Sequence, residues 1–362
     1  MMFVADLHND IVQRAMIGED VGKLTKQGHT DLSRLIESCI DLEILIIWVS
    51  TIDKSESAFQ KANEMYDKIE ELSINNNLVD IPKDLNSIID NKKNNLLSIP
   101  IGIEGGEAIE NSIDKLFHFI ERGILYFGPT WNHSLDWVSS GKDEFEKNDR
   151  IKIKGLSKFG KEVIHTCNEN NVIIDVSHIG EKSFWDISSI SKKPFIASHS
   201  SVYNLCPHFR NLKDEQILEI KNSQGIIGVN PYPFFIDPNF KKKESNYVKN
   251  IKKELDQIGI NDTNPNLRWI KKQHYLQKKL TNIVPSLDLF IDHIEYIIKL
   301  IGIDYVAIGS DYDGLDCLPK GWNSCLDHIK ISESLDQKGY SFLEIEKIMG
   351  KNFLRLLENN FK

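Results

Sequence analysis

Two histidines each follow a short apolar segment within residues 172–211. His178 comes just after the apolar run 172–176, and His199 comes just after the run 194–197. Residues 181–190 lie between the two runs and have the length of one helix, so the stretch predicts two parallel strands joined by a helix. Parallel strands end at the same edge of their sheet, and both histidines are expected at that edge. One such histidine alone would fit a capping or core role, but two together favour a metal site.

Two other segments also end in metal-ligating side chains. The short segment 3–6 leads into His8 and Asp10, which are two residues apart and therefore point to the same side of the chain. The apolar segment 96–103 ends at Glu104, which is followed by two glycines that permit a tight turn and a close approach of the backbone. The alternative for these residues is an ordinary polar turn with exposed or helix-capping acids.

The order of the remaining segments predicts the fold. Further strands are expected at 40–50, 124–127, 225–230 and 305–308, and further helices at 55–72, 84–91, 112–122, 157–170, 213–222, 285–301, 325–337 and 341–358. Residues 138–154 are charged and predict an exposed loop, whereas the polar segment 237–284 predicts helices around 244–256 and 266–281.

Eight strands, nearly all separated by helices and without an interdomain linker, predict a single-domain (β/α)8 barrel over residues 1–362. Residues 237–284 would then be an excursion over or beside the active-site mouth. An open doubly wound sheet is the alternative, and it is disfavoured because no glycine-rich phosphate loop follows the first strand.

Composition excludes several classes of function. The net charge of −9 over 362 residues, without an obvious basic face, argues against nucleic-acid binding. The sequence contains no run of about 18 apolar residues, so no membrane span is expected. The five cysteines are scattered and never spaced C-x-x-C, and the chain begins without the features of a secretory leader, so a reduced, cytoplasmic protein is expected.

The strand ends together suggest a hydrolytic metal centre. The candidate ligands are His8, Asp10, Glu104, His178 and His199. Imidazole with carboxylate suits zinc best, with iron, cobalt and manganese as alternatives. Two ions about 3.5–4 Å apart can share a hydroxide and make it available at neutral pH.

Asp311 follows the last predicted strand and is not needed as a ligand, so it is the candidate to accept the proton of that hydroxide and pass it to a leaving amine. Its alternative role is a helix N-cap, which Asp313 beside Gly314 fits better.

Several short motifs, in this order, make the chain similar to the membrane dipeptidase (renal dipeptidase) family of the amidohydrolase superfamily. The motifs are D-x-H-x-D at 6–10, I-E-G-G at 103–106, G-L-S-x-F-G at 155–160, I-D-V-S-H at 174–178, S-H-S-S at 198–201, R-N at 210–211 and G-S-D-Y-D-G at 309–314. The resemblance runs nearly end to end.

It implies a barrel with two zinc ions per chain, one held by His8 and Asp10, the other by His178 and His199, and both bridged by Glu104. It also implies Asp311 as the catalytic acid and base, and Arg210 as the ligand of the substrate's free carboxylate.

Two positions depart from the family pattern. Trp131 stands where animal members carry a histidine thought to contact the substrate carbonyl, and His133 lies two residues further on. Phe235 aligns with a tyrosine of the animal members, and Tyr232 lies nearby. The polar and aromatic residues around Trp131 suggest a wall of the substrate site, and we expect Tyr232 to line it as well.

The leading hypothesis is therefore a zinc dipeptidase whose partner is a small dipeptide with a free C-terminal carboxylate. Deacylation of an N-acyl amino acid and opening of a lactone on the same site remain alternatives. The third hypothesis is a binding protein that has lost turnover. It is disfavoured because none of the candidate metal ligands is missing from the sequence. Whether the chain forms a homodimer stays open at this point.

Overall fold

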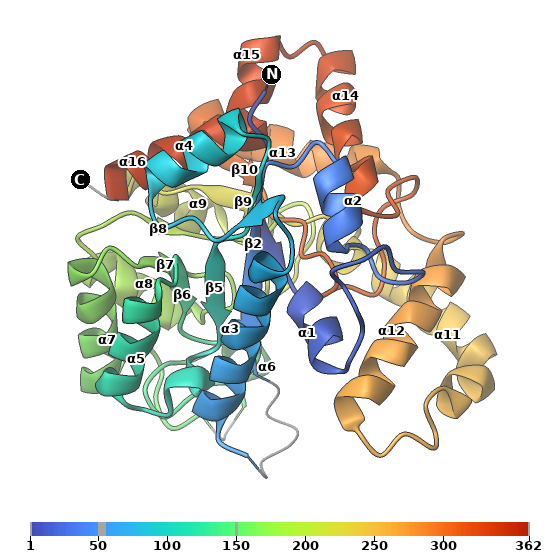
Figure 1. The fold of residues 1–362 in the computed structure, drawn as a ribbon, viewed down its shortest axis with the longest axis horizontal. Coiled ribbons are helices and arrows are strands. Elements are labelled where there is room, and N and C mark those ends of the chain that lie inside the picture. Colours follow the sequence, from blue (N-terminus) through green and yellow to red (C-terminus); the bar gives the residue numbers. More distant parts are fainter. Residues whose placement is uncertain (1, 50–55, 149–150, 361–362) are drawn as a thin grey trace.

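Alternating short strands and helices build a ring of parallel strands with its helices outside (Figure 1). The structure is a computed structural model that describes residues 2–49, 56–148 and 151–360. The barrel strands are β1 (Ala5–Asn9), β2 (Leu42–Trp48), β5 (Ile101–Glu104), β6 (Tyr126–Gly128), β7 (Ile173–Asp175), β8 (Phe195–Ile196), β9 (Ile227–Val229) and β10 (Val306–Ile308). Two short strands, β3 (Val79–Asp80) and β4 (Leu97–Ser98), pair beside β2.

Hydrogen bonding joins the barrel strands in the order β8-β7-β6-β5-β2-β1-β10-β9, and every pairing is parallel. A further parallel bridge between Ala197 and Ile227 connects the two outer strands. The ring is thereby nearly closed, which confirms the predicted (β/α)8 barrel and excludes the open doubly wound sheet.

The helices follow the strands along the chain. They are α1 (Ile11–Met16), α2 (Leu32–Glu37), α3 (Ala58–Ile74), α4 (Leu85–Lys93), α5 (Ile113–Arg122), α6 (Gly141–Glu146), α7 (Lys158–Glu169), α8 (Glu181–Ile190), α9 (Asp214–Asn222), α10 (Pro233–Ile236), α11 (Phe240–Gln257), α12 (Pro265–Leu280), α13 (Leu287–Ile301), α14 (Ile329–Gln337), α15 (Phe342–Glu346) and α16 (Asn352–Asn360). Shorter helical turns are η1 (Gly106–Ile109), η2 (Ile303–Tyr305), η3 (Cys325–Asp327) and η4 (Lys347–Lys351). Among the described residues, no helix combines the length and the apolar character that crossing a membrane requires.

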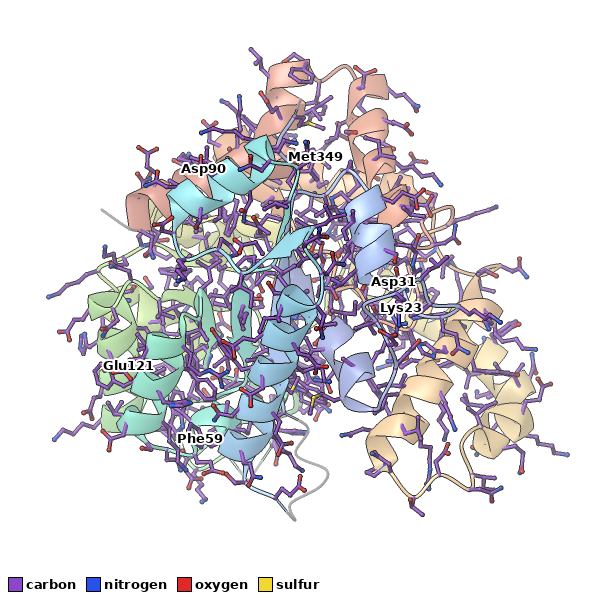
Figure 2. All side chains as sticks on the ribbon, in the orientation of Figure 1. Lys23, Asp31, Phe59, Asp90, Glu121 and Met349 are labelled. Carbon is purple, nitrogen blue, oxygen red and sulfur yellow. The ribbon has the colours of Figure 1, made fainter. Side chains whose placement is uncertain are left out.

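Alternate residues of the strands face two different packing layers. On β2, Ile44 and Ile46 pack with Leu7 of β1, whereas Leu45 and Ile47 pack in the larger cluster that includes the surrounding helices. This alternation is expected of a barrel whose strands are covered on both sides. At one end, η4 contacts β1 and β10 and buries Met349 (Figure 2), and α16 packs beside α4 (Figure 1).

Local sequence signals fix many helix ends. Ser112 and Ser157 accept hydrogen bonds from the backbone N–H three residues on and so cap α5 and α7. Gly123 ends α5 with φ 96°, a conformation that glycine adopts at low cost. These signals explain why most predicted helices lie within a few residues of their expected bounds.

The exposed loop predicted at 138–154 is partly wrong. This segment contains α6, and Val138, Ser139 and Ser140 are fully buried. The polar sequence suggested exposure, but hydrogen bonds allow these residues to be buried. Ser139 donates a hydrogen bond to Glu144 and shares another with Ser183. Some positions of these predictions lie outside the described residues. They are 149–150 of this loop, residue 50 of the strand expected at 40–50 and residue 55 of the helix expected at 55–72.

The other differences concern the C-terminal region and the excursion. The helix expected at 341–358 is divided into α15, η4 and α16, and the one at 325–337 into η3 and α14. Residues 237–284 form the two predicted helices, α11 and α12, which extend to one side of the barrel (Figure 1). Asp313 does not cap a helix: its carboxylate forms a buried ion pair with Arg14 at 3.1 Å and accepts hydrogen bonds from His29 and Thr30.

Candidate active site

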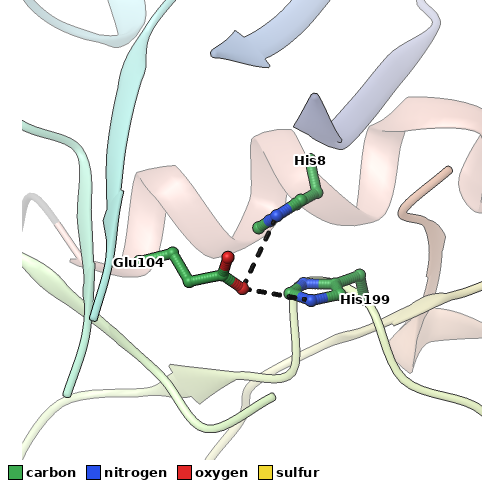
Figure 3. A group of neighbouring side chains, drawn as sticks. All are labelled: His8, Glu104 and His199. Carbon is green, nitrogen blue, oxygen red and sulfur yellow. Dashed lines mark ion pairs between the residues drawn. The ribbon is translucent and has the colours of Figure 1, made fainter. Parts of the chain in front are cut away.

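The predicted ligand residues all stand at the carboxyl ends of barrel strands. His8 lies in β1 with Asp10 just beyond it, and Glu104 is the last residue of β5. His178 and His199 each come three residues after the end of their strands, β7 and β8. Parallel strands bring these ends to one rim, as expected of this fold. Figure 3 shows that His8, Glu104 and His199 point toward one another.

The side chains converge on Oε1 of Glu104. This oxygen lies 2.8 Å from Nε2 of His178, 3.4 Å from Nε2 of His199 and 3.7 Å from Nε2 of His8. The Nε2 atoms of His178 and His199 are 3.0 Å apart, and Nε2 of His8 is 3.6 Å from Asp10 Oδ2. The five predicted ligands are therefore brought together.

Hydrogen bonds hold the ring of His8 from its far side. Its Nδ1 lies 2.8 Å from the hydroxyl of Tyr126, which in turn donates to the carbonyl of Leu7 at 3.1 Å. Because the Tyr126 hydroxyl donates its hydrogen bond to the Leu7 carbonyl, its oxygen accepts a hydrogen bond from Nδ1–H of His8. The lone pair of His8 Nε2 then faces the centre, where that buried nitrogen has no hydrogen-bond partner among the described residues.

The rings of His199 and His178 are held in the same way. The Ser198 hydroxyl donates to Asp175 Oδ2 at 2.6 Å and lies 2.7 Å from Nδ1 of His199, so it accepts from that nitrogen. Oδ1 of Asn132 lies 3.1 Å from Nδ1 of His178. All three imidazoles thus have an oxygen at Nδ1 and present Nε2 to one point, the arrangement in which histidine binds a metal.

Burial sets the protonation of these groups. It lowers the pKa of His178 and His199 well below the usual value, and the nearby charge of Arg210 acts in the same direction. Burial also raises the pKa of Asp10 well above the usual value, and the charge of Glu104 adds to this. Neutral imidazoles beside crowded carboxylates form a donor set that divalent cations fit, because cations relieve the repulsion between the acids.

Asp311 lies beside Asp10 in a tight turn. Its φ is 56°, and Asn230 Nδ2 donates to its Oδ2 at 3.0 Å. A Cβ at Gly314 would lie 2.2 Å from Asp311 Oδ1 and 2.4 Å from Asp10 Oδ2, so only glycine leaves both carboxylates in place. Burial raises the pKa of Asp311 well above its usual value, and the charges of Asp10 and Glu104 add to this.

Arg210 is buried on the loop after β8. Its guanidinium donates to the carbonyls of Ser177 and His199, the latter at 3.0 Å, and to Ser200 Oγ at 3.4 Å. These bonds tie the loop to the ends of β7 and β8. Burial lowers the pKa of Arg210 to about 10 against the opposing charges of Glu104 and Asp311, so the guanidinium remains charged at neutral pH.

One cavity of about 300 Å³ connects these groups. All the predicted site residues line it except His8, which is fully buried. Trp131 reaches it from the loop after β6, and its ring centroid lies 6.3 Å from that of His178. Tyr232 also lines it, with its hydroxyl donating to Asp316 at 3.0 Å, and Phe235 packs against the Tyr232 ring.

The residues behind the imidazoles were not identified from the sequence. Tyr126, Asn132, Asp175 and Ser198 each bond to a candidate ligand or to the residue that holds it. One signal was available for Asp175, because a charged residue inside the apolar run 172–176 needs a polar partner. Tyr126 gave none, since its partner lies 118 residues away.

Comparison with known proteins places this chain in a family. The family model described as membrane dipeptidase (peptidase family M19) matches residues 1–361. Dipeptidase tcpJ of Claviceps purpurea is 25% identical over 341 residues, covering 91% of this chain and 69% of that protein.

Two crystal structures share the fold. One is a metallopeptidase from Rhodobacter sphaeroides (TM-score 0.80, 20% identity, 99% of both chains). The other is the probable dipeptidase PvdM from Pseudomonas aeruginosa (TM-score 0.80, 22% identity, 99% of this chain and 95% of that one). The chain described here belongs to the membrane dipeptidase family, peptidase family M19, whose members are metal-dependent hydrolases of peptide bonds.

Proposed function

We propose that this protein is a dinuclear zinc dipeptidase that hydrolyses dipeptides with a free C-terminal carboxylate. The observation that carries the proposal is the convergence of three Nε2 atoms and Glu104 Oε1, with each imidazole held at Nδ1 by an oxygen. His8 and Asp10 would hold one ion, His178 and His199 the other, and Glu104 both. Mixed imidazole and carboxylate donors favour zinc.

The ions, when bound, would polarise the scissile carbonyl and supply hydroxide at neutral pH. Side chains of the protein would carry out the proton transfers. Asp311 accepts a proton on Oδ1 during attack and returns it to the leaving amine, while Asn230 holds the other oxygen. The fixed rings of His8, His178 and His199 prevent the ligands from turning away, which keeps the site preorganised.

Arg210 would bind the carboxylate of the substrate. A guanidinium has five N–H donors, and the contacts with Ser177, Ser200 and His199 leave its Nε–H and one N–H of Nη2 without a partner among the described residues. Two such donors suit bidentate binding of a carboxylate. The related metallopeptidase from Rhodobacter sphaeroides binds a phosphinate mimic of the dipeptide L-Ala-D-Ala, which supports a dipeptide as the substrate here.

A substrate panel tests this proposal. The zinc-loaded protein should release free amino acids from L-L or L-D dipeptides much faster than it deacylates N-acetyl amino acids or opens lactones. An enzyme that prefers the N-acyl amino acids or lactones would contradict the dipeptidase assignment while leaving the metal centre intact. The variant Glu104→Gln is the control, because it should abolish every activity that depends on this centre.

A further inference from the structure

Three tryptophans form one wall of the active-site cavity. Trp48 is the last residue of β2, Trp131 lies on the loop after β6, and Trp269 belongs to α12. The ring centroids of Trp48 and Trp131 are 4.8 Å apart in an edge-to-face arrangement, and those of Trp48 and Trp269 are 6.3 Å apart. All three line the cavity and are partly exposed.

Segments far apart in the sequence build this wall. The register pairs Trp48 with Glu104 on the adjacent strand β5, which places Trp48 beside the metal-ligand cluster. Its Nε1 is buried and has no hydrogen-bond partner among the described residues. Trp269 reaches the wall from the excursion formed by α11 and α12. A ligand in the cavity would contact all three indoles, which line it.

Trp48, which Trp131 and Trp269 contact, lies across the cavity from Arg210. In the strand order, β2 is four strands from β8, which is the opposite side of an eight-stranded ring. Arg210 follows β8, Trp48 ends β2, and Glu104 ends β5 next to β2. A dipeptide with its carboxylate at Arg210 and its peptide bond at the ligand cluster therefore extends its amino-terminal residue toward the tryptophans.

From this placement we propose that Trp48, Trp131 and Trp269 form the subsite for the side chain of the substrate's amino-terminal residue, and that the subsite selects an aromatic side chain. Aromatic rings favour offset-stacked and edge-to-face contacts with one another, and these three indoles offer both faces and edges. Glycine or alanine at that position would leave the wall in contact with water. The proposal rests on the dipeptidase function proposed above.

Selectivity between matched dipeptides tests the subsite. The measurement is the ratio of kcat/KM for Phe-Ala to that for Gly-Ala, which cancels differences in metal content or in the fraction of folded enzyme. The wild-type ratio should exceed about tenfold, since filling an apolar pocket commonly changes specificity by that much or more. Trp269→Ala and Trp131→Ala should each reduce the ratio several-fold, and Trp269→Phe should restore part of it.

Trp185 provides a matched control. It is a tryptophan on the outside of the barrel, 36% exposed on α8, and it does not line the cavity. Trp185→Ala should leave the ratio at its wild-type value. A second series, Ala-Phe against Ala-Gly, should respond much less to Trp269→Ala, because its variable side chain belongs to the carboxyl-terminal residue.

The outcomes separate the subsite from the function. Cleavage of Phe-Ala and Gly-Ala with a ratio that Trp131→Ala and Trp269→Ala leave unchanged would overturn the subsite alone. A preference for Lys-Ala over Phe-Ala, or a larger effect in the Ala-Phe series, would also overturn it. If the zinc-loaded protein cleaves no dipeptide at all, the proposed function fails and the subsite falls with it.

Discussion

The hydroxyl of Ser198 donates a hydrogen bond of 2.6 Å to Oδ2 of Asp175. Because its proton is committed to that carboxylate, its oxygen accepts from Nδ1 of His199, 2.7 Å away. The pair therefore selects the His199 tautomer whose Nε2 can bind a metal. Such carboxylate-linked contacts behind a ligand are as much part of a metal site as the ligands themselves.

Ser198→Ala should weaken zinc binding about 10–100-fold, the usual cost of losing a partner behind a ligating histidine. Competition with a zinc chelator measures this affinity. Ser183→Ala is the control, because Ser183 is equally buried but bonds to Ser139 rather than to an imidazole. Equal affinities in Ser198→Ala and Ser183→Ala would mean that Ser198 does not orient His199.

Asp311→Asn should retain the metal but lose turnover. The amide keeps the size of the side chain and can still accept from Asn230, yet it cannot take up a proton. We expect kcat to fall about 10²–10⁴-fold, the scale of general acid–base catalysis. Steady-state kinetics with parallel metal analysis provides the test, and turnover close to wild type with full metal content would remove Asp311 from the chemistry.

Arg210→Ala should lower kcat/KM for dipeptides more than for the corresponding dipeptide amides. The loss of kcat/KM on a dipeptide should correspond to about 2–4 kcal/mol, as for truncation of one partner of a buried charge pair. A substrate with an amidated C-terminus offers no carboxylate charge to Arg210, so the fall in its kcat/KM should be much smaller. Because Arg210 also binds the carbonyls of Ser177 and His199, the amide series measures its structural role. Equal losses on both substrates would assign Arg210 to structure alone.

His293 should make stability depend on pH. Burial lowers its pKa to about 4, and its neutral ring accepts from Val202 N–H at 3.0 Å. Between pH of about 6.5 and 4 the unfolded chain binds a proton at this residue and the folded chain does not. Stability should therefore fall as the pH is lowered through this window, by up to about 1.4 kcal/mol per pH unit from this group.

Denaturant unfolding at several pH values measures this slope. In His293→Gln the group does not titrate, so the slope between pH 6.5 and 4 should be shallower than in the wild type by about that amount. Protonation of the metal-site residues contributes to both proteins and cancels in the difference. Identical slopes would show that His293 is protonated in the folded protein.

The barrel could be predicted because its strands are continuous apolar runs, each buried on both faces, and because its helices carry their own caps, such as Ser112 and Ser157. The ends of those runs also identified His8, Glu104 and His199. The parts that escaped prediction depend on tertiary packing. Whether Tyr126 meets Nδ1 of His8 depends on the order in which the strands join the ring.

Two further misses have the same cause. Trp269 lies on a polar helix with no sign in the sequence that α12 brings it to the cavity. Asp313 resembled a helix cap beside a glycine, but it pairs with Arg14, 299 residues away. Local patterns identify the element and its end, whereas the partner of a polar side chain is decided by the fold.

The metal content of the active enzyme tests the central claim most directly. Metal-free protein is titrated with zinc while dipeptide hydrolysis and protein-bound zinc are measured on the same samples, the latter by elemental analysis. We predict that activity rises until two zinc ions are bound per chain and then stays constant, because three histidines surround the Glu104 carboxylate and Asp10 lies beside one of them. Full dipeptidase activity with one ion or fewer per chain would contradict the dinuclear site.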